Sequence, residues 1–372
     1  MYQKIVKLHK KIETPALIVD QHQLELNIDK MQKLADKNRV KLRPHIKTHK
    51  SAFIAQSQLN KGAIGITVAK TGEAEVMAAS GIKDIFIANQ ITHPLKLKRL
   101  KKLHQKISVS IGVDNPAQVD MLKIYFSNPD KCLSVLIEID SGLKRCGINV
   151  GSPLIDLANK IEKSKGLRLK GIFTHAGQVY AAKSKQEIRR IGETEAEIMA
   201  KGYDMLTQDG FNVETVSVGA TPTVPYSAAH PKVTEIRPGN YVFYDNIQYT
   251  LGACRRNQWS LYILATVISQ PTTKRIVIDA GSKALNLDRG AHTAQLINGY
   301  GRILNINGTI NKLSEEHGII DLPVERKIPI GSPVLIIPNH ACAVTNLYSS
   351  FILFSKSGGI RQMNVDARGE SQ

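Results

Sequence analysis

Eight short apolar runs, rich in β-branched residues, recur through the first two-thirds of the 372-residue chain, and most are separated by segments with helical spacing. Strands that alternate with helices form parallel sheets, and eight strand–helix units in about 250 residues are typical of a (β/α)8 barrel. We therefore predict an α/β fold, a (β/α)8 TIM-type barrel. A doubly wound open sheet is the alternative, although the absence of GxGxxG after the first strand weakens its dinucleotide-binding form. The runs are VKLRP (40–44), AIGITV (63–68), DIFIA (84–88), ISVSIGV (107–113), LSVLIEID (133–140), LKGIFTH (169–175), TVSVGA (215–220) and VTEIRPG (233–239).

The sequence pattern changes near residue 245: helical periodicity is lost, and apolar runs follow one another directly. Such a pattern is typical of a β-domain. We therefore expect a barrel over 14–245 and a β-domain over 246–372, joined by 1–13, where IVKLHKK is a candidate extra strand. The later runs are 260–269, 274–281, 301–308, 333–344 and 350–355.

Composition places the chain among ordinary globular proteins, with 42% hydrophobic and 22% charged residues. No stretch approaches the roughly 18 apolar residues that span a bilayer, and no apolar region follows the basic start, so neither a membrane span nor a secretory signal is predicted. The four cysteines (Cys132, Cys146, Cys254 and Cys342) form no CxxC pair. We therefore expect a reduced, cytoplasmic protein without a disulfide framework.

The formal net charge of +18 raises the question of nucleic-acid binding. The lysines are spread along the chain, however, and the densest basic patch (96–106) has the leucine spacing of a helix with a solvated face. Aromatic residues make up only 5%, and none are interleaved with the basic patch as a stacking surface would require. A basic surface that attracts anionic small molecules is the better interpretation.

Polar and cationic residues follow several of the predicted barrel strands, at the end where barrels carry their chemistry. One rim would collect a lysine, two arginines and two turns rich in backbone donors, with few carboxylates. This composition suits an anionic cofactor, such as a phosphate, beside an amine nucleophile. The residues are Lys47, Arg145, His175, Tyr180, the turn GATPT (219–223) and Arg237 followed by Gly239 and Asn240.

Each of these positions also has a purely structural explanation. A lysine after a strand is commonly a solvated surface residue, and GATPT is equally an ordinary turn. Arg145 and Arg237 could each be structural ion-pair partners. What favours the functional interpretation is that all of them fall at the same end of successive strands.

The segment Asn339-His340-Ala341-Cys342 forms a second constellation. On a strand, residues two apart face the same way, so the imidazole of His340 and the sulfur of Cys342 could meet at one point. Nitrogen and sulfur donors together favour Zn²⁺, and two protein ligands would leave positions open for substrate. The alternative is a buried cysteine beside an unrelated histidine.

Five segments are collinear with the pattern of a known family: RPHIKTHK (43–50), DSGLKRCG (140–147), GATPT (219–223), EIRPGNYVFYD (235–245) and PNHACAV (338–344). From about Thr14 to Tyr348, the chain resembles the D-threonine aldolase / D-serine dehydratase-like family, which comprises fold-type III pyridoxal-phosphate enzymes of the alanine-racemase type. RPHxKTHK and PNHAC are the specific parts of this resemblance.

The resemblance implies a role for each matching residue. Lys47 would bind the pyridoxal aldehyde covalently, and Arg145 would lie near the phenolic oxygen of the cofactor. Arg237 would face the pyridine nitrogen, while His175 and Tyr180 would lie beside the ring or substrate. The cofactor phosphate would be held by Gly219, Ala220, Thr221, Gly239 and Asn240. The metal, Zn²⁺ with Mn²⁺ or Mg²⁺ as alternatives, would be held by His340 and Cys342.

Two positions depart from the family pattern. Ala220 stands where many relatives carry Ser or Gly, which removes a possible hydroxyl contact to phosphate. Gln178 stands where His is expected, which puts substrate contacts from this loop in doubt. The His340–Cys342 pair resembles the dehydratase branch, because the aldolase branch more often combines His with Asp.

The resemblance thus implies a pyridoxal-phosphate- and metal-dependent lyase acting on β-hydroxy-D-amino acids, with dehydration of D-serine to pyruvate and ammonia favoured. The alternatives are an aldolase acting on D-threonine or 3-hydroxy-D-aspartate, and a 3-hydroxy-D-aspartate dehydratase. A non-catalytic pyridoxal-phosphate carrier would not need the metal pair. Family membership also implies a homodimer. The composition and the absence of a long apolar stretch predict neither nucleic-acid nor membrane partners.

Overall fold

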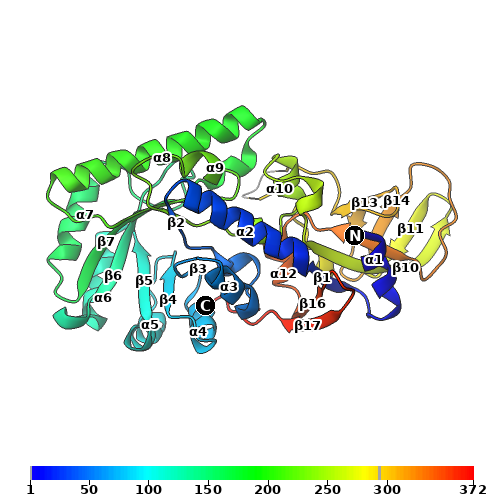
Figure 1. The fold of residues 1–372 in the computed structure, drawn as a ribbon, viewed down its shortest axis with the longest axis horizontal. Helices are drawn as coiled ribbons and strands as arrows, with labels where there is room; N and C mark the ends of the chain where they lie inside the picture. The colour runs from blue at the N-terminus through cyan, green and yellow to red at the C-terminus, as the bar shows by residue number, and fades with distance from the viewer. Residues whose placement is uncertain (1, 292–294) are drawn as a thin grey trace. The chain divides into compact units, whose positions relative to one another are not determined.

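The computed structural model describes residues 2–291 and 295–372, which divide into two compact units (Figure 1). The barrel unit comprises Lys30–Lys47, Ile54–Gly239 and Gly369–Gln372. The β-unit comprises the chain up to Asp29, Thr48–Phe53 and Asn240–Arg368. Neither unit is one continuous stretch of sequence.

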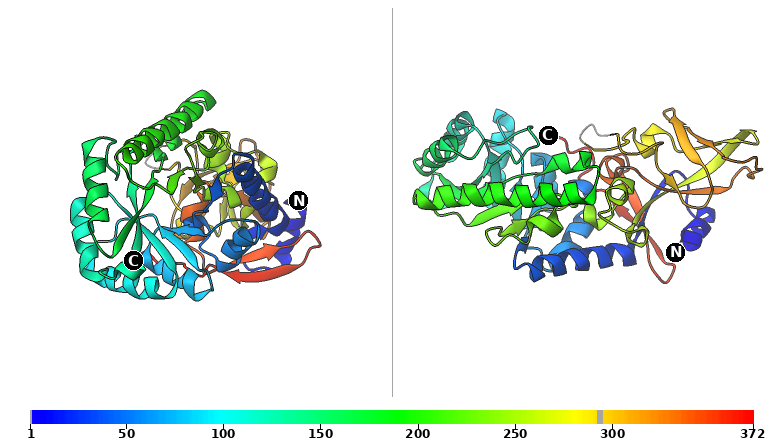
Figure 2. Two further views of the ribbon diagram at one scale, coloured as in Figure 1. Left: turned by 60° about the vertical axis from the view of Figure 1, so that its left-hand side comes forward. Right: turned by 90° about the horizontal axis from the view of Figure 1, so that it is seen from above.

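The barrel unit contains eight parallel strands in the order β2-β9-β8-β7-β6-β5-β4-β3 (Figure 2). Between the two ends of this order, a parallel bridge joins His45 to Thr67, and the Thr67 N–H donates to the carbonyl of Pro44 at 2.8 Å. These contacts close the sheet, which confirms the predicted (β/α)8 barrel. The strands are β2 (Lys41–Leu42), β3 (Ile66–Val68), β4 (Asp84–Ile87), β5 (Ser108–Val113), β6 (Leu133–Glu138), β7 (Leu167–Phe173), β8 (Thr215–Val218) and β9 (Glu235–Ile236).

The barrel helices begin at local capping signals and bury one apolar face. In α5, Pro94 occupies the first turn, the His93 ring accepts the Leu95 N–H, and the leucines at 97, 100 and 103 are buried. The lysines of the basic patch alternate with these leucines in the sequence and lie outside the core. The helices of this unit are α4 (Thr71–Ala79), α5 (Pro94–Lys106), α6 (Pro116–Tyr125), α7 (Ser152–Glu162), α8 (Lys185–Gln208) and α9 (Val224–Ser227); α2 (Gln21–Lys37) and α3 (Ala52–Asn60) run from the β-unit into it.

The β-unit is built on a mixed sheet in the order β13-β14-β11-β10-β1-β16-β17, with β15 on β10 and β12 on β15. Strand β1 (Ala16–Asp20) pairs antiparallel with β10 and parallel with β16, so the amino-terminal strand completes a sheet made mostly from the end of the chain. The other strands are β10 (Leu261–Thr272), β11 (Arg275–Ile278), β12 (Arg302–Ile303), β13 (Thr309–Leu313), β14 (Gly318–Asp321), β15 (Pro333–Ile337), β16 (Ser350–Phe354) and β17 (Ile360–Asn364).

The opening segment differs from its predicted strand. It forms α1 (Tyr2–Lys7) followed by a 3-10 turn, η1 (Leu8–Lys10). Ile5 and Leu8 are both buried, and their separation of three residues places them on one helical face, so the apolar spacing fits a helix better than a strand.

Short helical segments contain four of the candidate residues, Lys47, Tyr180, Asn240 and Cys342. Within the described residues, no helix is both long enough and apolar enough to cross a bilayer. The short segments are α10 (Asn246–Thr250), α11 (Ser282–Leu285), α12 (Ala341–Thr345), η2 (Ile46–Thr48), η3 (Pro129–Lys131), η4 (Gly177–Ala181), η5 (Asn240–Val242) and η6 (Arg256–Gln258).

Candidate active site

Lys47 lies in η2, just beyond the carboxyl end of β2, where the sequence predicted the cofactor lysine. Its backbone N–H points to Nδ1 of His45 at 3.4 Å, and His45 is itself bridged to Thr67 of β3. The lysine therefore follows a segment that is fixed where the barrel closes. Its side chain is partly exposed.

The turn at 219–223 is tightly built, and Gly219 is required at its start. The φ of Gly219 is +123°, and a Cβ at this position would lie 2.9 Å from Cγ2 of Val224. The Gly219 N–H donates to Oε1 of Glu195 at 2.9 Å, so this expected phosphate donor is already bound within the chain. In contrast, Oγ1 of Thr221 is buried without a hydrogen-bond partner in the described structure. An unpartnered buried hydroxyl on this turn fits an absent phosphate group.

Arg237 is almost fully buried at the carboxyl end of β9. Its Nη1 donates to Oγ of Ser217 at 2.5 Å, and its Nη2 donates to the carbonyl of Thr174 at 2.5 Å. The guanidinium carbon lies 5.7 Å from the ring centroid of Phe86 and 5.2 Å from that of Phe173. Two hydrogen bonds and two aromatic faces therefore fix its orientation.

A chain of buried polar groups leads from Arg237 into the barrel interior. The Ser217 hydroxyl donates to Oε1 of Glu235 at 2.5 Å, and Oε2 of Glu235 accepts from Nε of Arg43 at 2.8 Å. Arg43 also donates from both terminal nitrogens to Asp84, at 2.7 and 3.2 Å. The two arginines are thus balanced by two carboxylates, and Arg237 belongs to this network.

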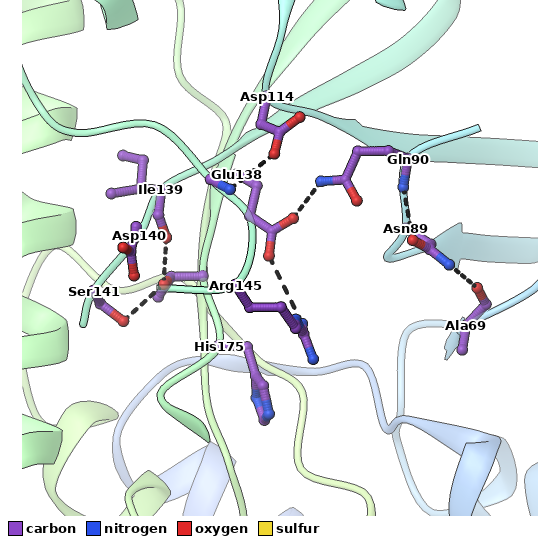
Figure 3. A network of polar contacts seen from close by, with 12 residues as sticks. Ala69, Asn89, Gln90, Asp114, Glu138, Ile139, Asp140, Ser141, Arg145 and His175 are labelled. Carbon is purple, nitrogen blue, oxygen red and sulfur yellow. Dashed lines mark hydrogen bonds and ion pairs between the residues drawn. The ribbon is translucent and has the colours of Figure 1, made fainter. Parts of the chain in front are cut away.

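Arg145 lies beside Glu138 at the end of β6, with Nη2 3.9 Å from Oε1 (Figure 3). Gln90 donates from Nε2 to the other carboxylate oxygen of Glu138. Burial raises the pKa of Glu138, although Gln90 and Arg145 oppose that shift. The Arg145 side chain is half exposed, so its guanidinium remains accessible to an anionic ligand.

The same corner of the barrel brings Asp114, Glu138 and Cys146 together, with one potential metal-ligand atom from each within 4.8 Å of the others. The two carboxylates have other partners in the protein. Asp114 accepts the Gly147 N–H at 2.8 Å, and Arg145 lies beside Glu138 as a positive charge. Both carboxylates of the cluster therefore already have partners within the chain.

His175 and Tyr180 follow β7, as the sequence predicted. Nδ1 of His175 lies 3.5 Å from the carbonyl of Gly219, which connects the β7 end to the 219–223 turn. Tyr180 lies in η4. Gln178, also in η4, donates to the carbonyl of Ser141 at 2.9 Å, and its Oε1 is buried without a partner in the described residues.

The structure brings His340 and Cys342 together, but the predicted strand geometry was wrong. Strand β15 ends at Ile337, and α12 begins at Ala341, with His340 as its N-cap. The change from strand to helix follows the Pro338-Asn339 step, since proline cannot donate to a sheet ladder. The two side chains nevertheless interact closely enough to shift the pKa of His340.

Polar neighbours orient the His340–Cys342 pair. Nδ1 of His340 lies 2.8 Å from Oδ2 of Asp288, and Sγ of Cys342 lies 3.1 Å from Oγ1 of Thr48. Burial lowers the pKa of His340, but the adjacent Cys342 sulfur and Asp288 carboxylate outweigh burial and raise it to about 10. A histidine bound through one nitrogen to a carboxylate is the arrangement in which metal-ligating histidines commonly occur.

Asp245 holds residues around the His340–Cys342 pair in place through hydrogen bonds. It is fully buried, accepts the Ala341 N–H at 2.9 Å, and accepts a hydrogen bond from Nδ2 of Asn240 at 2.6 Å. Nδ2 of Asn240 also lies 4.0 Å from Sγ of Cys342. The Asp245 carboxylate therefore fixes the start of α12, the helix that contains Cys342. Burial raises the pKa of Asp245, while His340 opposes this shift.

Several of these residues were missed by the sequence interpretation. Asp288 lies in a loop without periodicity, and Glu195 lies among other charged residues on α8, so neither has a local signal. Asp245 ends the family segment EIRPGNYVFYD and caps α10, accepting the Gln248 N–H at 2.9 Å. An N-cap aspartate was therefore the one signal that could have been noticed.

Comparison with known proteins identifies the family of this chain. Residues 19–246 match the family described as "Alanine racemase, N-terminal domain", and residues 260–354 match "Putative serine dehydratase domain". The chain belongs to the D-serine dehydratase / D-threonine aldolase-like family of fold-type III pyridoxal-phosphate enzymes. The resemblance predicted from the sequence is thus confirmed.

Members of this family with known activities match nearly the whole chain. D-threo-3-hydroxyaspartate dehydratase of Delftia sp. is 31% identical over 366 residues, covering 94% of this chain and 96% of that protein. D-serine dehydratase of Dictyostelium discoideum is 31% identical, with coverages of 94% and 95%. D-threonine aldolase of an Arthrobacter species is 30% identical, with coverages of 97% and 94%. These dehydratases and aldolases are all lyases, and this chain is placed among them.

The solved structure of the Delftia dehydratase superposes with a TM-score of 0.90 at 30% identity, covering 95% of this chain and 97% of that chain. A cysteine-to-alanine mutant of the same dehydratase is described in a metal-free form. This description implies that the dehydratase also has a metal-bound form.

Proposed function

We propose that this protein is a pyridoxal-phosphate- and metal-dependent lyase of β-hydroxy-D-amino acids, with D-serine dehydration as its principal reaction. The observation that carries the proposal is the His340–Cys342 pair, oriented by Asp288 and Asp245, in a chain of this family. D-serine would yield pyruvate and ammonia.

Pyridoxal phosphate, when bound, withdraws electrons from the α-carbon of an amino acid. In our proposal Lys47 holds the cofactor aldehyde and later moves the α-proton, while Arg145 contacts the phenolic oxygen. Arg237 faces the pyridine nitrogen, as part of a network that keeps its guanidinium fixed. His175 and Tyr180 line the ring or substrate. The unpartnered Thr221 hydroxyl supports a phosphate at the 219–223 turn, with Gly239 and Asn240 as further contacts. Gly219 and Ala220 shape this turn, because their N–H groups are bound to Glu195 and Thr223.

The metal in the proposal is Zn²⁺, held by Nε2 of His340 and Sγ of Cys342. A nitrogen and a sulfur ligand favour zinc over Mg²⁺, and two ligands leave coordination positions for substrate. The metal would supply Lewis acidity to the β-hydroxyl, which is the leaving group of the dehydration. The other nitrogen of His340 is already bound to Asp288, which supports this choice of donor atom.

Two related reactions use the same residues and compete with this proposal. Dehydration of 3-hydroxy-D-aspartate is favoured by the similarity to the Delftia enzyme. Retro-aldol cleavage of D-threonine or 3-hydroxy-D-aspartate is the activity named for other relatives. The cysteine in HAC favours dehydration over cleavage. We further propose a cytoplasmic homodimer whose partners are small-molecule substrates.

The test is a product analysis on the purified protein supplied with pyridoxal phosphate and zinc. D-serine, D-threonine and threo-3-hydroxy-D-aspartate are each incubated with it, and keto acid, ammonia, glycine and aldehyde are measured. We expect pyruvate and ammonia from D-serine, without glycine. Glycine and aldehyde without keto acid would show that the protein is an aldolase. The absence of product from all three substrates would refute the proposal.

A further inference from the structure

The side chain of Glu195 hydrogen-bonds to the turn at 219–223, which is proposed to hold the cofactor phosphate. It comes from the middle of α8 and is fully buried. Oε1 accepts the Gly219 N–H at 2.9 Å, and Oε2 lies 3.0 Å from Oγ1 of Thr223. A carboxyl group thus fixes both ends of the turn whose Thr221 hydroxyl is unpartnered.

The hydrogen bonds around Thr223 accommodate a protonated carboxyl. Oγ1 of Thr223 accepts the Ala220 N–H at 3.1 Å and lies 3.1 Å from the Ala220 carbonyl as well as 3.0 Å from Glu195. A hydroxyl has one proton and two lone pairs, so it can donate to only one of those two oxygens. If Glu195 carries a proton on Oε2, it donates to Thr223, and Thr223 donates to the Ala220 carbonyl. Every hydrogen-bonding position of the hydroxyl is then used.

Burial favours the same protonated state, against the polar and charged neighbours of Glu195. The Gly219 N–H, the hydroxyls of Thr223 and of Ser227 in α9, and the guanidinium of Arg237 each favour the ionised form and lower the pKa of Glu195. Arg237 is the sole charged group among them, and its terminal nitrogens donate to Ser217 and Thr174. Burial is the largest influence on Glu195 and raises its pKa.

A phosphate group at this turn adds about two negative charges at pH 8. A neighbouring ionised carboxylate would repel it, and like charges that share a site raise the pKa of the weaker acid. A protonated carboxyl keeps both hydrogen bonds to the turn without that repulsion.

We propose that Glu195 is an uncharged carboxylic acid when the cofactor is bound, and that it acts as a positioning residue for the phosphate-binding turn. This inference rests on the proposed pyridoxal-phosphate site. It assigns Gly219 a structural role, because its N–H serves Glu195, and it leaves the Thr221 hydroxyl to contact the phosphate.

The decisive experiment is infrared difference spectroscopy of the cofactor-loaded wild type against cofactor-loaded Glu195→Gln at pH 8. Glutamine is isosteric and keeps both hydrogen bonds to the turn. We expect the wild type to show the carbonyl stretch of a protonated carboxyl, above the amide I band, and the variant to lack it. Loss of a carboxylate band instead would overturn the proposal. If the glutamine variant does not fold, Thr223→Val serves in its place, because removal of the hydroxyl should shift the carboxyl band, and an unshifted spectrum would contradict the assignment.

A binding comparison checks the positioning role separately from the site itself. Dissociation constants for pyridoxal phosphate and for pyridoxal, which lacks the phosphate, are measured with the wild type and with Glu195→Gln. We expect the preference for the phosphate form to change by less than about threefold, since the neutral hydrogen bonds remain. A loss greater than about tenfold would mean that the ionised form is needed. Failure of the wild type to bind pyridoxal phosphate at all would instead refute the proposed function.

Discussion

His340 and Asp288 lie 2.8 Å apart, Nδ1 to Oδ2, although 52 residues separate them in sequence. The pairing leaves the second ring nitrogen of His340 for a metal and restricts rotation of the ring. Loss of such an orienting carboxylate typically lowers metal affinity by about 10–100-fold. We therefore predict that Asp288→Asn binds Zn²⁺ about 10–100-fold more weakly, as measured by competition with a chromophoric chelator. Asp120→Asn, on the barrel surface, is the matched control and should bind zinc like the wild type.

Cys342 should be essential for metal binding but not for cofactor binding. We predict that Cys342→Ala retains the visible absorbance of bound pyridoxal phosphate while its zinc content and its release of pyruvate from D-serine both fall to background. Cys132→Ala, in the barrel unit and partly exposed, should match the wild type in all three measurements. Normal zinc content and turnover in Cys342→Ala would remove this residue from the site.

Lys47 should be the residue responsible for the visible absorbance of the cofactor-loaded protein. We predict that Lys47→Ala loses the visible absorbance of the covalently bound cofactor, because the amine that would form the covalent bond is removed. Lys41→Ala, at the exposed start of β2, is the control and should remain yellow. A Lys47→Ala variant that keeps the band would show that the wrong lysine has been chosen.

The buried network below Arg237 should contribute strongly to barrel stability. Glu235→Ala would leave Nε of Arg43 and the Ser217 hydroxyl without their acceptor. Breaking a buried ion pair by removal of one partner costs about 3–5 kcal/mol. Urea unfolding should show a loss of this size, whereas Glu214→Ala, which breaks the exposed pair with Arg168, should cost less than about 1 kcal/mol.

Glu195 should also make the stability of the cofactor-free protein depend on pH. Because burial raises its pKa above the unfolded value, the folded state binds more protons than the unfolded state between these two pKa values. The free energy of unfolding therefore falls as the pH rises through this window. We predict that Glu195→Gln gains stability relative to the wild type as the pH rises through the same window, because glutamine has no proton to lose there. A pH-independent difference in urea midpoints would contradict the raised pKa.

The sequence predicted most of the barrel because its signals are local. Each of the eight apolar runs became a strand, and helices such as α5 followed leucine spacing and an N-terminal proline. The order of the β-unit sheet could not be predicted in this way, because β1 pairs with β10 and β16 from far along the chain. The error at IVKLHKK has a different cause, because the three-residue spacing of Ile5 and Leu8 is a local helical signal that was taken for a strand.

The candidate site was predicted in its motifs but not in its supporting contacts. The prediction for His340 and Cys342 assumed a strand, whereas the two residues lie at a helix N-terminus. Glu195 and Asp288 reach their partners across 24 and 52 residues, and such contacts leave no periodic trace in the sequence.

We propose that a metal at His340 and Cys342 would act on the β-hydroxyl, while Lys47 and the cofactor would act on the α-carbon. To test this division of roles, D-serine is followed in deuterated water with the cofactor-loaded protein, before and after zinc is removed by a chelator. We predict that the chelated protein still exchanges the α-proton for deuterium, that its pyruvate release falls to background, and that added zinc restores it. Undiminished pyruvate release from protein that has lost its metal would contradict the claim.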